Sequence, residues 1–160
     1  MIQRRQNLYL GLVIILSLIL SVSTYSIAEL GIQGQESGKS FIEMSYSSNK
    51  LITENVNTEI SQAKIQFALL CVAIFALFAI LSFKKLKRQI TFCSFNLAFI
   101  LFLPIFFYID YFSLSKLYDI NSINFMGTAI IPIALLLLNI LAIRGVVRDY
   151  NLLKSMDRIR

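Results

Sequence analysis

Residues 65–83 read IQFALLCVAIFALFAILSF, an apolar run that contains no charged residue. Three other stretches, at 8–28, 90–109 and 126–146, have similar length and character. A helix of about twenty apolar residues spans the hydrocarbon core of a bilayer. Lipid offers no partner to a bare backbone amide, so such segments cross as helices rather than as open strands. The sequence therefore predicts an all-α membrane protein, a bundle of four transmembrane helices.

The composition agrees with this fold class. Hydrophobic residues make up 57% of the chain and charged residues only 15%, with neither His nor Trp. A soluble domain rarely carries near-continuous apolar runs with so little amphipathic patterning. Outside the helices there remain loops at 29–64 and 110–125 and a tail at 147–160, so residues 1–160 are expected to form a single membrane domain.

Basic residues gather on one side of the predicted bundle. The N-terminal segment, the connection between the second and third helices, and the C-terminal tail with the last residues of the fourth helix hold eleven basic residues and two acidic ones. The loops at 29–64 and 110–125 hold four basic residues and seven acidic ones. Lys and Arg in short loops stay in the cytoplasm during insertion. Both termini are therefore expected to be cytoplasmic, with the two loops outside.

The basic side is expected to contact lipid rather than nucleic acid. Its cations are divided among three short segments that flank lipid-embedded helices. Anionic headgroups attract such residues by about 1 kcal/mol each near the surface. Membrane lipids, including anionic headgroups, are thus expected partners, and nucleic acid is not.

The first loop contains signals for short elements. Residues 40–46 and 50–53 flank the turn-like Ser47-Ser48-Asn49 and predict a small hairpin. Residues 57–59, Asn-Thr-Glu, resemble a helix start, which predicts that the second helix begins about two turns before the lipid.

The second loop and the tail show helical spacing. In 110–125, Leu114, Leu117 and Tyr118 share a helical face, which predicts a short helix in the headgroup region. The tail is expected to continue the fourth helix as an amphipathic extension. Its apolar stripe consists of Leu152, Leu153, Met156 and Ile159.

The first helix also resembles a secretory signal peptide. Arg4 and Arg5 precede the apolar run, and Ser26-Ile27-Ala28 resembles a cleavage site. The run is longer than most signal cores, so retention of residues 1–28 is favoured, and cleavage after Ala28 is the alternative.

No residue group in or between the predicted helices carries recognisable catalytic chemistry. The chain has no His and no carboxylate within a span, which argues against metal sites and proton relays. Cys71 and Cys93 lie roughly 18 Å and 5 Å from the same membrane edge, too far apart for a disulfide, so both are expected to be packing residues. We expect no enzymatic activity, no cofactor and no metal.

Two Asn and two Pro lie inside the predicted helices. Asn96 and Asn139 lie at one depth, roughly 9 to 10 Å from the cytoplasmic edge, so they are expected to be able to hydrogen-bond together. Pro104 and Pro132 also lie at matched depths, and each frees the backbone carbonyl four residues earlier. The Asn pair is interpreted as a structural contact that holds two helices together or as a site for a substrate or partner. The proline kinks either shape the packing or widen the outer half of the bundle.

Both ends of the chain carry motifs of a known family. The start reads MIQRRQNLY over 1–9, and the end contains LAIR at 141–144, Arg148-Asp149 and LKSMDRIR at 153–160. With the four-helix layout, these motifs resemble a bacterial family known as domain of unknown function 4293, although Arg5 stands where the family's pattern has an apolar residue. The resemblance implies a small multi-pass protein of the bacterial inner membrane with no assigned activity.

These motifs fall at the cytoplasmic edge of the predicted bundle. We expect Arg4 to pair with Asp149 or Asp157, while the apolar stripe of the tail docks a partner protein. The alternative is a solvated tail that its charges anchor at the headgroups. The candidate interaction edge consists of Gln3, Arg4, Arg144, Asp149, Asp157 and Arg158.

Because the predicted spans carry no recognisable catalytic groups, their surfaces are the candidate functional regions of the protein. The sequence thus favours a non-enzymatic accessory or scaffolding subunit of a larger envelope complex, which binds protein partners through its helices and cytoplasmic edge. The alternative is a small transporter or channel for a neutral or lipidic solute, which would use Asn96, Asn139 and the proline kinks. A membrane enzyme ranks third.

Overall fold

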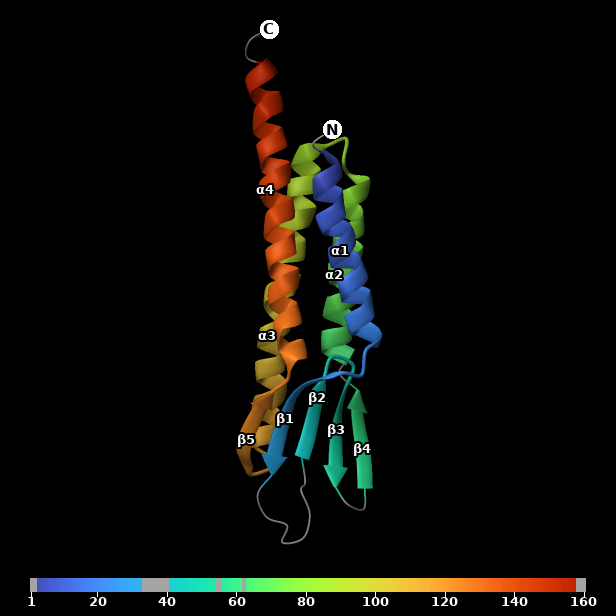
Figure 1. The fold of residues 1–160 in the computed structure, drawn as a ribbon, viewed down its shortest axis with the longest axis vertical. Helices are drawn as coiled ribbons and strands as arrows, with labels where there is room; N and C mark the ends of the chain where they lie inside the picture. The colour runs from blue at the N-terminus through green and yellow to red at the C-terminus, as the bar shows by residue number, and fades with distance from the viewer. Residues whose placement is uncertain (1–2, 33–40, 54–55, 62, 158–160) are drawn as a thin grey trace.

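The protein consists of four long helices with a five-stranded sheet at one end (Figure 1). The structure, a computed structural model, describes residues 3–32, 41–53, 56–61 and 63–157, without the side chains of 3–5, 53–61 and 157. The helices are α1 (Gln3–Val22), α2 (Ala63–Leu81), α3 (Leu86–Ser115) and α4 (Ile131–Asp157). The strands are β1 (Ser26–Ile32), β2 (Phe41–Ser45), β3 (Ser48–Thr53), β4 (Val56–Ser61) and β5 (Ile120–Phe125), and a 3-10 turn, η1 (Gly127–Ile130), precedes α4.

The helices form a closed ring. Each of α1, α2, α3 and α4 packs against the next, and α4 closes the ring against α1. α1 begins and α4 ends at the same end of the bundle, opposite the sheet (Figure 1). We call these two ends of the bundle the terminal end and the sheet end.

The helices are apolar enough for a membrane. Three segments, Ala63–Leu81, Leu86–Ser115 and Gly127–Met156, have the length and hydropathy of membrane spans, and α1 contains a shorter apolar stretch, Gln6–Val22. Large apolar side chains such as Phe67, Phe102 and Leu137 are exposed on their outer surfaces. Helices that are apolar on every side suit a lipid environment. The fold is therefore that of a mostly helical membrane protein.

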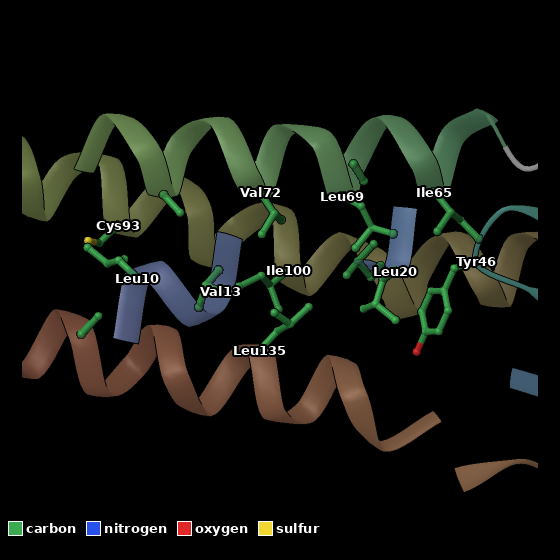
Figure 2. Packing of buried hydrophobic residues seen from close by; sticks show 14 of the residues in the cluster. Leu10, Val13, Leu20, Tyr46, Ile65, Leu69, Val72, Cys93, Ile100 and Leu135 are labelled. Atoms are coloured by element: carbon green, nitrogen blue, oxygen red, sulfur yellow. The ribbon is translucent and has the colours of Figure 1, made fainter. Parts of the chain in front are cut away.

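Close packing fills the interior of the bundle (Figure 2). Leu10 and Val13 of α1, Leu69 of α2, Ile100 of α3 and Leu135 of α4 are fully buried in one cluster. In a bilayer, the transfer of such side chains from lipid to the bundle interior gains little free energy, because the acyl chains are equally apolar. The bundle is accordingly held by dispersion contacts and by its few polar contacts.

A sheet occupies the region where loops were expected, so the all-α prediction is wrong there. The strands are antiparallel in the order β4-β3-β2-β1-β5. The pairing of β2 with β3 confirms the predicted hairpin. The sheet forms because apolar residues alternate in neighbouring strands, Leu30 and Ile32 in β1 with Ile42 and Met44 in β2, which gives it one apolar face.

Two helix predictions in the loops are also wrong. Residues 57–59 lie in β4, paired with β3, and do not start a helix. In 110–125, α3 continues to Ser115 and residues 120–125 form β5, so no separate headgroup helix exists there. A capping signal acts locally, whereas the free edges of β3 and β1 offer whole rows of backbone partners.

The helices begin and end at different residues than the runs 8–28, 90–109 and 126–146 predict. α1 ends early because the chain turns into β1. α3 is longer at both ends. α4 begins after η1 and runs to Asp157, so the tail continues this helix, as predicted.

The last turns of α3 cover the apolar face of the sheet. Leu114 packs in a second core cluster with Leu30, Ile42 and Met44. The opposite face is polar, since Glu29 lies opposite Glu43, and Glu43 opposite Lys50. The sheet therefore uses one face for packing and presents the other to water.

Tyr46 anchors the sheet to the bundle. It follows β2, and its fully buried side chain lies at the sheet end of the main core (Figure 2). Its ring meets Phe107 edge to face, with centroids 5.5 Å apart. Its hydroxyl donates a hydrogen bond of 2.8 Å to the carbonyl oxygen of Thr128. Burial raises the pKa of Tyr46, so the hydroxyl remains a protonated donor at neutral pH.

Tyr46→Phe is expected to destabilise the fold by about 1 kcal/mol, the usual net value of one buried hydrogen bond. The ring contact with Phe107 is retained, so the loss reports the hydroxyl alone. Unfolding in detergent, followed by circular dichroism, measures this difference. Tyr108→Phe, at an exposed tyrosine, is the control; equal stability of the two variants would contradict the anchoring role.

Candidate functional site

An apolar groove lies between α3, the start of α4 and the edge of the sheet. Its volume is about 540 Å³, within the roughly 300 to 1,000 Å³ typical of ligand sites. We call it the proline groove, because Pro104 and Pro132 both line it. The other lining residues are Ile27, Ala28, Leu30, Met44, Ile100, Leu101, Phe107, Tyr108, Tyr111, Ile123, Phe125, Ala129, Ile133 and Leu136.

The two prolines hold different positions in their helices. Pro104 lies inside α3, and whether it bends this helix stays a prediction. Pro132 is the second residue of α4, so it belongs to the first turn, where proline is well tolerated, and does not interrupt the helix. The Thr128 carbonyl, expected to be freed by Pro132, accepts hydrogen bonds from the Ile131 amide and the Tyr46 hydroxyl.

The groove opens sideways. Leu101 on α3 is 48% exposed, Tyr108 is 67% exposed, and Ile133 on α4 is 58% exposed. The register of β1 with β5 places Ile123 opposite Leu30, so both lie on the sheet face that closes the groove at one end. The groove therefore has helical walls, a floor of strands and an apolar rim.

The structure brings the two buried asparagines together. The Asn96 side-chain nitrogen, Nδ2, donates to Oδ1 of Asn139 over 3.4 Å, and Nδ2 of Asn139 donates to the Cys93 carbonyl over 3.1 Å. Both side chains are fully buried between α3 and α4. Cys93, also buried, and Cys71 are free thiols. The amides thus join two helices near the terminal end.

A second buried polar pair joins α1 to α4. Nε2 of Gln6 donates to Oδ2 of Asp149 over 2.6 Å, and both residues are buried. Gly145, one turn before Asp149, makes room for this contact, because a Cβ there would lie 2.7 Å from Cγ of Gln6. Sequence reasoning placed Asp149 at an interaction edge, but the structure gives it a partner inside the bundle.

The remaining edge residues are only partly described. The side chains of Gln3, Arg4 and Asp157, and all of Arg158, fall outside the described residues. The pairing of Arg4 with an aspartate therefore stays a prediction. Arg144 is exposed on α4, beside a shallow hollow that Arg148 also lines.

One ion pair was not anticipated. Lys64 Nζ at the start of α2 lies 3.7 Å from Oδ1 of Asp110 near the end of α3. Lys64 is exposed and Asp110 is nearly buried. The two residues lie at the same predicted membrane edge and have opposite charges. This feature of the sequence could have predicted the ion pair. Within the described part of the chain, no group of three or more His, Cys, Asp or Glu residues is placed to hold a metal.

The sequence matches the family described as Domain of unknown function (DUF4293) over residues 2–159, nearly the whole chain. The chain belongs to this DUF4293 family. No curated protein matches it at a significant level. The family assignment agrees with the resemblance of the two ends, and it ties the proline groove to no particular ligand.

For this DUF4293 chain, a double-mutant cycle on Asn96→Ala and Asn139→Ala is expected to give a coupling free energy of about 0.6 to 2 kcal/mol, the range for hydrogen bonds between membrane helices. Unfolding by SDS titration of the purified protein measures it. Asn96→Ala with Ser113→Ala, an exposed residue further along α3, should be additive. Additivity of the Asn pair would show that the hydrogen bond contributes nothing.

The effect of Gly145→Ala on stability is expected to change sign when Gln6 is also replaced by Ala. In the wild type, the new Cβ displaces the Gln6 side chain and breaks its bond to Asp149, which destabilises the protein. In a Gln6→Ala background the clash is gone, and Ala should stabilise the helix by about 1 kcal/mol relative to Gly. The same SDS titration checks both signs; stabilisation in both backgrounds would contradict the contact.

Proposed function

We propose that this protein is a non-enzymatic, four-span protein of the bacterial inner membrane with both termini in the cytoplasm. The common end at which α1 begins and α4 ends supports an even number of crossings. The excess of basic residues at that end supports its cytoplasmic placement. The burial of Leu10 and Val13 against the other helices supports retention of α1.

The proline groove is its binding site, and the ligand is the hydrocarbon part of a lipidic molecule. The observation that carries this proposal is a cavity of about 540 Å³ lined by apolar and aromatic side chains and open on its side. With the sheet outside, the groove lies in the outer half of the membrane, where its open side faces acyl chains. A hydrocarbon chain in the groove gains dispersion contacts with this lining, the same kind of contact that holds the helices together.

The size of the groove favours a chain over a partner helix. An α-helix with its side chains is about 10 Å wide. A helix of this width would cover the open side of the groove. A flexible hydrocarbon chain can enter the space between α3, the start of α4 and the strands.

We favour a protein that binds a lipidic ligand over one that transports it across the membrane. The bundle interior is packed with fully buried side chains, and Tyr46 fills its sheet end. Asn96 and Asn139 are bonded to each other rather than turned toward an open path. We therefore place the protein as an accessory subunit of an envelope complex, and transport of a lipidic solute is the second candidate, favoured by the same groove.

The terminal end supplies a surface for the protein partner. α4 extends beyond the other helices there (Figure 1). Leu152, Leu153 and Met156 are exposed on this extension. A partner that covers them would remove apolar surface from water.

Ile133→Trp is expected to fill part of the proline groove and lower lipid retention, because the indole takes the space of the hydrocarbon chain and removes its dispersion contacts with the lining. Native mass spectrometry of the full chain, purified in mild detergent, measures the fraction that carries lipid. Ile74→Trp is the matched control, since Ile74 is 51% exposed on α2 and does not line the groove.

Equal retention by both variants and the wild type would contradict lipid binding in the groove. The same preparations test the accessory role. A partner protein in fixed stoichiometry is expected, whereas a homo-oligomer free of partners would contradict this role and favour the transport candidate.

A further inference from the structure

A hollow at the terminal end gathers basic side chains from two distant segments. Residues 84–88, which include the first three residues of α3, form one wall, and Tyr150, Leu153 and Lys154 of α4 form the other. Its volume is about 590 Å³. We call it the basic hollow.

The charges in the basic hollow all have one sign. Lys84, Lys85, Lys87 and Arg88 face the hollow from one side and Lys154 from the other, and none of its described lining residues is acidic. Two acids lie on this part of α4: Asp149 is buried and bonded to Gln6, and the side chain of Asp157 lies outside the described residues. Like charges that converge repel each other, and an anion in the hollow would relieve this repulsion.

Backbone donors add to this field. Lys85 is the N-cap of α3 and makes no side-chain capping bond, so the first-turn amides of a thirty-residue helix remain available as donors. The N-terminus of a helix favours a phosphate group through these amides and its dipole. The helix start and the five cations point to the same ligand chemistry.

We propose that the basic hollow binds the phosphate of an anionic membrane lipid from the cytoplasmic leaflet. The hollow adjoins the end of an apolar span, since α2 ends at Leu81, a few residues before Lys84. Leu153 and Phe83 are exposed beside the cations and offer apolar contact to the first part of an acyl chain. A free phosphate would leave this apolar surface unused.

This inference rests on the proposed orientation, but not on the proline groove, which lies at the sheet end. Failure of one site leaves the other intact, because the two are tested with different residues and lipids. Lipid lost from Ile133→Trp reports the groove, and the preference for an anionic headgroup reports the hollow.

The test titrates the full chain in detergent with short-chain phosphatidylglycerol and with phosphatidylcholine. The wild type should bind the anionic lipid more tightly. The double variant Lys87→Gln, Lys154→Gln should bind it about 25-fold more weakly, or about fivefold for each cation. Lys116→Gln is the matched control, because it removes the same charge from an exposed lysine at the sheet end and should change nothing.

Three results would overturn the proposal. One is equal affinity for both lipids, and another is an equal loss in Lys116→Gln and Lys87→Gln, which would indicate net charge alone. The third is binding of inorganic phosphate as tight as that of phosphatidylglycerol, which would indicate a soluble phosphate ligand. Circular dichroism confirms that each variant is folded, and recovery of binding by Lys87→Arg, Lys154→Arg supports the site.

Discussion

Backbone hydrogen bonding in apolar surroundings is the constraint on which the rest of this structure depends. Within α2, α3 and α4 the helical ladder satisfies the amides, and hydroxyls such as Ser94 bond to carbonyls one turn earlier. Where α4 begins, Pro132 supplies no donor. The Thr128 carbonyl there accepts hydrogen bonds from the Ile131 amide and from Tyr46, which follows β2 and is far away in sequence. The sheet and the helices are joined at this point.

The same junction produces the groove. A sheet spaces its residues differently from a helix, so β1 and β5 cannot fill the space between α3 and the start of α4. Extension of α3 over the sheet buries Leu114 against Leu30 and leaves the neighbouring surface, at Pro104 and Tyr108, open on one side. The proline groove thus follows from the meeting of two kinds of secondary structure.

Particular residues show how far sequence reasoning reached. The hairpin of β2 and β3 followed from a turn signal between two short runs, and the contact of Asn96 with Asn139 followed from their equal depth. Both inferences rest on separations counted in residues along the chain, and the sequence gives these separations directly. The placement of β5 beside β1 did not follow, because strand pairing across many residues depends on which edge is free. Gln6 gave no signal as the partner of Asp149, since a polar residue before a span is ordinarily solvated.

By itself, the sequence determined that the chain is mostly helical and suited to a membrane, because apolar length and the need to satisfy backbone amides in lipid leave few other folds. It also placed the basic segments at one end. Only the tertiary structure decided that the loops form one sheet, that Tyr46 fills the end of the bundle and that an apolar groove opens beside it. These features include contacts between residues more than eighty positions apart, such as Tyr46 with Thr128 and Leu30 with Ile123, and no local pattern encodes such contacts.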